Sequence, residues 1–281
     1  MPENQNPHVR RMARFLPFDP SHDQIYEEYQ VDSDTLNLDT VAYKYVIGAA
    51  SSKAHSIILT GDAGHGKTHL CRRFIETHLG YNENEARRII NEACDGRQVI
   101  PHKNKAEPSG GVRIFKDISE FSPEIAAELI ENSNIENSLT IICANEGRLR
   151  AVLASRNAGE YCAELLKSFG ACFGEGKASN DGRVHIVNLN HQSVAAGRDN
   201  HSLADLALRD WTSGTRWRKC IDCDSRDTCP IIRNREMLSE KVSLEAAATR
   251  KSKLRLLFAT LERIGYVITI RDMLMAFAYL L

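Results

Sequence analysis

The chain has 281 residues, of which 42% are hydrophobic and 26% are charged, and its formal net charge is −1. This length and apolar content suffice for one large α/β domain, or for a core domain with a small satellite. A net charge so close to zero excludes a global attraction to nucleic acid or to an anionic membrane, but leaves a local basic patch open.

The sequence predicts a cytoplasmic protein with no membrane partner. It contains no run of about 18 apolar residues, the length that a membrane span needs. Its N-terminus, MPENQNPHVRRMARF, lacks the apolar core of a signal peptide. In a reducing compartment the eight cysteines are expected to be core residues, metal ligands or redox groups and not disulfides.

Strand and helix patterns alternate through the first two thirds of the chain. Residues 1–30 are polar with scattered aromatics and predict an irregular lead-in. The expected elements are a helix at Asp39–Ala50, a strand at Ser56–Thr60, helices at Lys67–Leu79 and Glu83–Glu92, a loop over 95–111, a strand at Val112–Phe115, a helix opened by Ser122 and Pro123, a strand at Leu139–Ala144, a helix over 150–168 and a strand at Val184–Leu189. This alternation predicts a three-layer α/β sandwich around a mostly parallel sheet.

Beyond about residue 200 the strand patterns fade, and residues 235–281 predict helices with a break at Gly265. We therefore expect four segments: a lead-in at 1–34, an α/β core at 35–199, a cysteine-containing insertion at 200–234 and a small helical domain at 235–281. The final run, MLMAFAYLL, has no capping residue after it, so we expect the protein to continue past Leu281.

Eight residues between the first predicted strand and the next helix fit the pattern GxxxxGK[ST]. They read Gly61-Asp62-Ala63-Gly64-His65-Gly66-Lys67-Thr68. Glycines allow the tight turn that brings backbone N–H groups onto phosphate oxygens, and the helix N-terminus, which includes His69, adds positive potential. Lys67 is placed to reach the β- and γ-phosphates, and the Thr68 hydroxyl to bind Mg²⁺.

The alternative is a glycine-rich turn that matches by chance. From average residue frequencies, the pattern occurs by accident in roughly one chain in a hundred of this length. Its position, after a predicted strand and before a predicted helix, makes chance still less probable, because the mechanism requires that context. The sequence therefore predicts a P-loop that binds ATP with Mg²⁺.

Two carboxylates follow the strand at Val112–Phe115. A P-loop needs an acidic residue on a neighbouring strand to hold Mg²⁺, and Asp117 is the candidate, with Glu120 as a candidate base that polarises water. The usual arrangement of Asp followed directly by Glu is absent. Alternatively, the two carboxylates only stabilise the N-terminus of the helix that Ser122 opens.

An asparagine ends the most apolar strand, Leu139–Ala144. Ligands bind beyond the carboxyl ends of the strands in a parallel sheet, so Asn145 is placed to contact the γ-phosphate or its attacking water. The alternative is that Asn145 only caps the next helix.

A P-loop, an acidic strand end and a strand that ends in Asn together resemble AAA+ and STAND-like P-loop ATPases, in which that Asn is called sensor 1. The resemblance covers residues 35–281 and implies that the C-terminal helices form a lid. It matches Arg271, in Thr269-Ile270-Arg271-Asp272, to the sensor 2 arginine; the alternative is a surface residue. It also implies a homo-oligomer with an arginine supplied in trans, for which Arg148 and Arg150 are candidates.

More narrowly, Asn145-Glu146-Gly147-Arg148-Leu149-Arg150 and the cysteine segment resemble the ATPase component of bacterial phosphorothioation-dependent DNA restriction systems and related phage-defence ATPases. This resemblance implies a nuclease or another defence subunit as the partner, with DNA as the target.

The cysteine segment contains Cys220 and Cys223 in a Cys-x2-Cys spacing, followed by Cys229 and a proline. Two thiolates at this spacing can grip one metal ion, and Cys229 is within reach of the same ion. Zn²⁺ needs a fourth ligand, which His201 or a distant cysteine could supply, and a Cys-Pro ending also occurs in iron–sulfur sites. The alternative is three reduced cysteines in a loop. The remaining cysteines, Cys71, Cys94, Cys143, Cys162 and Cys172, are expected in the core.

Basic residues gather in two runs that could contact DNA phosphates. They are Arg216, Arg218 and Lys219, and then Arg250, Lys251, Lys253 and Arg255. A solvated helix face is the commoner origin of such runs.

Three functions fit these patterns. The leading one is an AAA+-like ATPase, active in a DNA-directed defence or remodelling complex, that positions water for attack on the γ-phosphate. The second is a nucleotide-gated switch or scaffold with little turnover, which the missing Asp-Glu pair favours. The third is a P-loop small-molecule kinase. A GTPase is disfavoured, because Asn104-Lys105-Ala106-Glu107 carries Glu where guanine recognition needs Asp.

Overall fold

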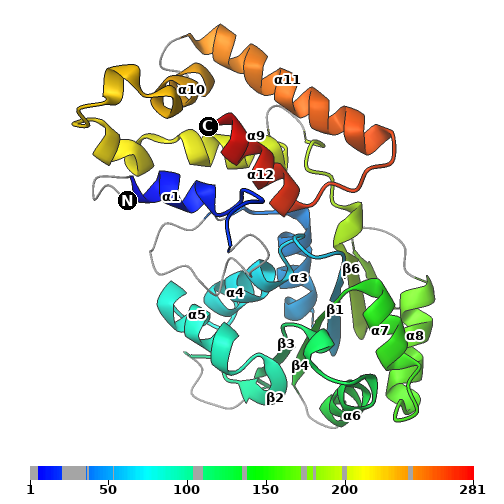
Figure 1. Cartoon of the computed structure of the whole chain (residues 1–281). Coiled ribbons are helices and arrows are strands. Elements are labelled where there is room, and N and C mark those ends of the chain that lie inside the picture. The colour runs from blue at the N-terminus through cyan, green and yellow to red at the C-terminus, as the bar shows by residue number, and fades with distance from the viewer. Residues whose placement is uncertain are drawn as a thin grey trace. The chain divides into compact units, whose positions relative to one another are not determined.

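The computed structural model describes residues 6–20, 36, 38–52, 54–103, 110–134, 138–171, 176–179, 182–197, 201–239 and 243–281. They form two compact units (Figure 1). The described residues of the α/β unit lie within Asp39–Gln192, and the helical unit combines the described residues up to Leu38 with those of Ser193–Leu281. This division differs from the four expected segments, because the N-terminal segment and the residues at 200–234 belong to the same unit as the C-terminal helices.

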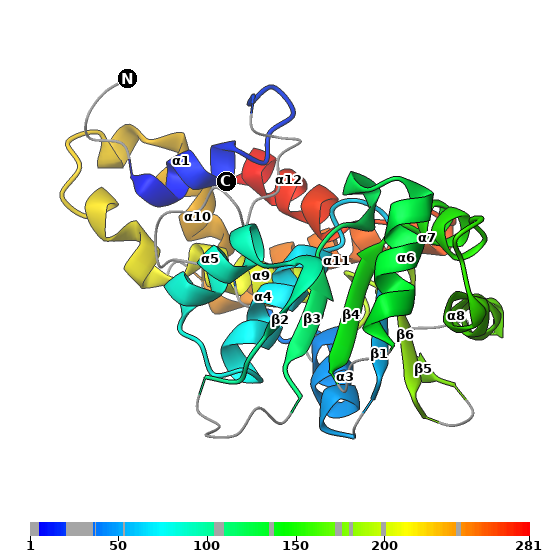
Figure 2. The same cartoon turned by 90° about the horizontal axis from the view of Figure 1, so that it is seen from below.

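The α/β unit is built on one six-stranded sheet. Its strands are β1 (Ser56–Thr60), β2 (Asp95–Ile100), β3 (Val112–Phe115), β4 (Leu139–Ala144), β5 (Lys177–Ala178) and β6 (Val184–Asn188). Figure 2 shows their order, β2-β3-β4-β1-β6-β5. The four inner strands are parallel, and β2 and β5 are antiparallel edges. The expected α/β class with a mostly parallel sheet is confirmed.

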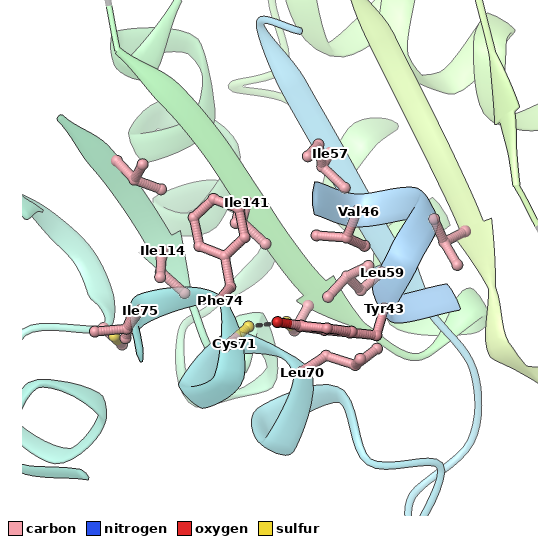
Figure 3. Close-up of a cluster of buried hydrophobic side chains, with 14 of the residues drawn as sticks. Tyr43, Val46, Ile57, Leu59, Leu70, Cys71, Phe74, Ile75, Ile114 and Ile141 are labelled. Atoms are coloured by element: carbon pink, nitrogen blue, oxygen red, sulfur yellow. Dashed lines mark hydrogen bonds between the residues drawn. The ribbon is translucent and has the colours of Figure 1, made fainter. Parts of the chain in front are cut away.

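Helices cover both faces of this sheet (Figure 1). One face packs against α3 (Val41–Ser51), α4 (Lys67–Thr77) and α5 (Glu83–Glu92), and the other against α6 (Pro123–Ser133), α7 (Glu146–Leu153) and α8 (Glu160–Ala171). Because both faces are covered, β1 is buried along its whole length and reads as a continuous apolar run instead of an alternation. In Figure 3, Phe74 of α4 and Val46 of α3 lie over Ile57 and Ile141 of the sheet.

Two expectations for the α/β unit were wrong. Asp95–Ile100 forms the edge strand β2 and not a loop, because antiparallel pairing with β3 overrides the poor strand propensity of Asp, Gly and Gln. The single helix expected over 150–168 is two helices, α7 and α8, separated by the turn residues of Ala154–Gly159. The motif Asn104-Lys105-Ala106-Glu107 and Cys172 lie outside the described residues.

The helical unit has α1 (Pro7–Ala13), α9 (Leu203–Thr212), the 3-10 turns η3 (Gly214–Cys220) and η4 (Arg226–Thr228), α10 (Pro230–Leu238), α11 (Leu244–Arg263) and α12 (Ile270–Leu280). The break expected at Gly265 is present, and this residue has φ +96°. None of the described helices is long and apolar enough to cross a bilayer.

The N-terminal segment is not an irregular lead-in, because it forms α1 and packs on the helices from the other end of the sequence. Asn6 caps α1 and donates from Nδ2 to the Arg216 carbonyl oxygen at 3.0 Å. His8 Nε2 lies 3.0 Å from the Trp211 carbonyl oxygen, and the His8 ring packs edge-on against Trp217. Burial lowers the pKa of His8 to about 4, so this histidine is a neutral core residue at physiological pH.

Candidate nucleotide-binding site

The predicted phosphate loop joins the carboxyl end of β1 to the N-terminus of α4. Gly61, Gly64 and Gly66 have φ values of +142°, +92° and +81°, which side chains other than glycine rarely adopt. A Cβ at Gly61 would also stand 3.1 Å from both Asn190 Oδ1 and Leu189 Cβ. The glycines of the motif are therefore required by the backbone path.

Helix α4 begins without a side-chain cap. Its N-cap is Gly66, whereas Thr40 caps α3 and Asn145 caps α7 through their side chains. The first N–H groups of a helix have no partner within the helix, and a side-chain cap normally satisfies one of them. In α4 these groups are those of Lys67, Thr68 and His69, and they can bind an anion at the positive end of the helix.

The Lys67 side chain is hydrogen-bonded to the start of the phosphate loop. Its Nζ donates to the carbonyl oxygens of Gly61 at 2.7 Å and Asp62 at 2.9 Å. Burial lowers the pKa of Lys67, whereas its electrostatic interactions with Cys143, Asp117 and Asp62 act in the opposite direction. The ammonium group thus lies at the centre of the loop, where bound phosphates would replace the two carbonyl oxygens as acceptors.

The other residues of the motif differ in exposure. Asp62 and Ala63 are exposed, Thr68 is half-buried, and His65 is buried with 1% of its surface accessible. His69 Nδ1 lies 3.3 Å from Arg72 Nη2, so this side chain contacts its own helix. His65 and His69 are therefore placed to contribute backbone N–H groups to the site, and Thr68 its hydroxyl.

Asp117 lies at the same edge of the sheet. Phe115 of β3 is in register with Ile142 of β4, and Ala144 is in register with Thr60 of β1. The carboxyl ends of these parallel strands therefore meet, and Asp117 is close enough to interact electrostatically with Lys67. One carboxylate oxygen of Asp117 accepts from the Ser119 N–H at 2.8 Å, which fixes the turn η1 (Ile118–Glu120).

Glu120 is exposed at the end of η1, and among the described contacts none joins it to the phosphate loop. Its assignment as a base that polarises water stays a prediction. Asp117 and Lys67 are brought together by the fold, whereas Glu120 is held only by the local turn.

Asn145 follows β4 and is the N-cap of α7. Its Oδ1 accepts from the Arg148 N–H at 2.8 Å, so the capping role considered for this residue is confirmed. The register of Ala144 with Thr60 places Asn145 beside the start of the phosphate loop. An asparagine also carries an NH₂ group, so Asn145 can cap α7 with its oxygen and donate to a phosphate or water with its nitrogen.

The sequence prediction did not include a pair of asparagines at this edge. Asn188 ends β6, the strand on the other side of β1, and Asn190 follows in the turn η2 (Leu189–His191). Asn190 Oδ1 accepts from the Asp62 N–H of the phosphate loop at 2.8 Å. The signal was present in the sequence, because Asn188 ends the apolar strand Val184–Asn188 much as Asn145 directly follows β4.

Two of the candidate arginines, Arg148 and Arg150, have partners within the α/β unit. Arg148 Nη2 donates to the Phe121 carbonyl oxygen, and Arg150 pairs with Glu146 at 3.0 Å and lies 4.8 Å over the Phe169 ring. Arg271 lies in the first turn of α12, in the helical unit. The expected roles of Arg148 and Arg150 as trans fingers, and of Arg271 as sensor 2, stay predictions.

The cysteine segment lies in the helical unit. Cys220 ends η3 and its Sγ accepts from Asn6 Nδ2 at 3.1 Å, Cys223 is exposed, and Cys229 is the N-cap of α10. Within the described ranges no three His, Cys, Asp or Glu side chains are grouped to hold a metal ion. Cys71, Cys94, Cys143 and Cys162 are buried as expected.

The predicted zinc or iron–sulfur site has a direct test. If Cys220 and Cys223 are ligands, the variant Cys220→Ala/Cys223→Ala loses the zinc or iron of the purified chain, because a thiolate pair supplies half of a four-ligand site. Elemental analysis measures the metal per chain. Ser225→Ala, in the same segment, is the control, and equal metal content in all three proteins would contradict the site.

No protein-family model matches the chain, and no curated protein or solved structure shows significant similarity to it. What the site can do therefore has to be inferred from its own geometry.

Proposed function

We propose that the chain is a Mg²⁺-dependent ATP-binding protein of the AAA+-like P-loop class, whose α/β unit is the P-loop sandwich and whose C-terminal helices act as a lid. The observation that carries this proposal is the phosphate loop itself. Its glycines hold left-handed φ values, the helix after it has no side-chain cap, and the Lys67 ammonium lies at its centre. A sequence motif and the backbone geometry that it requires thus coincide.

The residues present fit a magnesium ion. Mg²⁺ prefers oxygen ligands, and the Thr68 hydroxyl and the Asp117 carboxylate belong to the first turn of α4 and to the carboxyl edge of the sheet, respectively. When bound, Mg²⁺ neutralises developing charge on the phosphates. The interaction of Asp117 with Lys67 supports this assignment, because a carboxylate near the lysine is also near the phosphates that the lysine would bind.

Hydrolysis in this proposal relies on positioning and charge neutralisation. The N–H groups at the start of α4 bind the phosphates, Lys67 adds a positive charge, and Asn145 donates to the γ-phosphate or orients the water. Glu120 is the candidate that accepts a proton from the water.

A nucleotide-gated switch with little turnover is the second candidate. The observation that favours it is the geometry after β3, where Asp117 is followed by Ile118 and Ser119 and the next carboxylate, Glu120, is exposed at the end of a turn. Tight ATP binding without phosphate release, even in the presence of DNA and partner proteins, would identify the switch and exclude the ATPase.

The biological role rests on the resemblance of the segment Asn145–Arg150 and of the cysteine segment to defence ATPases. We propose a homo-oligomeric ATPase that serves a DNA-directed defence or remodelling complex with a nuclease subunit. Phosphate release that rises when DNA or the partner subunit is added supports this role, and release that is indifferent to both contradicts it.

A variant at Asn145 can distinguish ATP binding from ATP hydrolysis at the proposed site. We expect Asn145→Ser to keep the cap of α7, because serine is an equally good N-cap, and to lose the NH₂ donor. Phosphate release should fall about 10²-fold, the cost of one missing donor to transition-state charge, with ATP affinity and melting temperature nearly unchanged. Rates equal to those of the parent chain would restrict Asn145 to capping.

A further inference from the structure

The turn after β6 is hydrogen-bonded to the start of the phosphate loop. Asn188 Oδ1 accepts from the Asn190 N–H at 3.0 Å, and Asn190 Oδ1 in turn accepts from the Asp62 N–H at 2.8 Å. Leu189 packs so closely that a Cβ at Gly61 would lie 3.1 Å from it. The start of the loop is thus seated on β6 through two side-chain hydrogen bonds in series.

Asp62 is held on both sides of its backbone. Asn190 holds its N–H, and Lys67 Nζ donates to its carbonyl oxygen at 2.9 Å. Phosphates that bind Lys67 would compete for this ammonium and withdraw it from Asp62. Of these two side-chain hydrogen bonds, the one between the Asp62 N–H and Asn190 would then remain.

The same turn leads directly out of the α/β unit. Two residues after Asn190 the chain passes from Gln192 to Ser193, the first residue of the C-terminal part of the helical unit. There Ser193 Oγ donates to Glu262 Oε2 at 2.5 Å and the Val194 N–H donates to Glu262 Oε1 at 2.7 Å. Glu262 belongs to α11, so the first residues after the junction are fixed to a helix of that unit.

We propose that Asn190 is a positioning residue that keeps the phosphate loop in its binding conformation and makes the junction at Ser193 respond to the occupancy of the loop. This inference rests on the proposed ATP binding. It assigns a role to Asn190, which lies outside the phosphate motif. It also assigns a route from the phosphate loop to α11, through η2 and Glu262, that does not involve Arg271.

The first test is the ATP affinity of Asn190→Ala, measured by calorimetric titration with Mg²⁺ and ATP. Loss of one net hydrogen bond that orders the loop predicts about 3- to 10-fold weaker binding. The control is Asn82→Ala, which removes the side-chain cap of α5 in the same unit by the same chemical change. Asn82→Ala should lower the melting temperature and leave the ATP affinity as in the parent chain.

The second test is hydrogen–deuterium exchange without nucleotide. The Asp62 amide should exchange faster in Asn190→Ala than in the parent chain, and Asn190→Asp should restore its protection, because aspartate keeps an acceptor oxygen at the same position. Fast exchange in both variants would contradict the assigned bond.

The third test is the exchange of residues Ser193–Ala196 with saturating ATP. In the parent chain ATP should change the exchange rate of this segment, and in Asn190→Ala the change should be lost although ATP is bound. A purely structural role of Asn190 would leave this response intact. A parent chain that binds no ATP would refute the proposed function and this inference with it, whereas normal binding and an unaltered junction response in Asn190→Ala would refute the inference alone.

Discussion

Lys67→Ala is expected to weaken ATP binding at least about 30-fold and to abolish phosphate release while the α/β unit stays folded. The alanine removes the cation at the centre of the loop, and truncating one partner of a partly buried charged hydrogen bond costs about 2–5 kcal/mol. Calorimetric titration with Mg²⁺ and ATP measures the affinity, and a phosphate-release assay measures turnover.

The matched control is Lys103→Ala, a change of the same chemistry in the same unit. Lys103 pairs with Glu85 on the surface, and its side chain is 39% exposed. Such surface ion pairs contribute little to stability. Both the ATP affinity and the stability of Lys103→Ala should therefore stay close to those of the parent chain. Equal ATP affinity in Lys67→Ala and Lys103→Ala would refute the phosphate loop.

The affinity for ATP should also depend on pH through the same side chain. Because burial lowers the pKa of Lys67, this residue loses its charge at a less alkaline pH than an ordinary lysine. ATP binding is therefore expected to weaken as the pH rises through that lowered pKa.

Phe74→Ala is expected to have the largest effect on stability. Phe74 has no accessible surface and lies in the core cluster between α4 and the sheet, beside Ile75 and Cys71 of its own helix (Figure 3). Replacing a buried phenylalanine by alanine removes its packing and leaves a cavity, at a cost of about 3–5 kcal/mol. At about 2–4 °C per kcal/mol for a unit of this size, the melting temperature should fall by roughly 10 °C.

Val41→Ala is the control for this change. Val41 begins α3 but is 66% exposed, so its truncation creates no cavity and should cost less than about 0.5 kcal/mol. Thermal unfolding followed by circular dichroism compares the two variants. A loss below about 1 kcal/mol in Phe74→Ala would contradict the packing described for this face of the sheet.

The parts of the fold that could be predicted are those with local causes. Ser56–Thr60 and Leu139–Ala144 are short, mostly apolar runs, and both strands end where expected. Ser122 and Pro123 open α6 as N-cap and first residue, because a hydroxyl cap and a fixed φ act within one turn. The phosphate loop is a prediction of the same local kind, since its glycines and Lys67 are contiguous, and the structure gives those glycines the positive φ values that the motif needs.

The parts that could not be predicted depend on partners far along the chain. Strand β2 has a poor local propensity and exists because Val99 and Ile100 pair with Arg113 and Val112. Asn190 contacts Asp62 across 128 positions, and nothing in the local sequence gives that distance. Asp117 could be predicted as a magnesium ligand because it follows a strand, but its closeness to Lys67 depends on the order of β3, β4 and β1 in the sheet.

The helical unit is formed by segments that are far apart in the sequence, so it cannot fold until its C-terminal segment has been synthesised. Helix α1 leaves the ribosome well before Trp211 and Arg216, which its residues contact and which are made about 200 positions later. At about 5–20 residues per second, α1 waits roughly 10–40 s for them. During that interval the intervening α/β unit can fold alone, before the contacts of α1 with Trp211 and Arg216 can form.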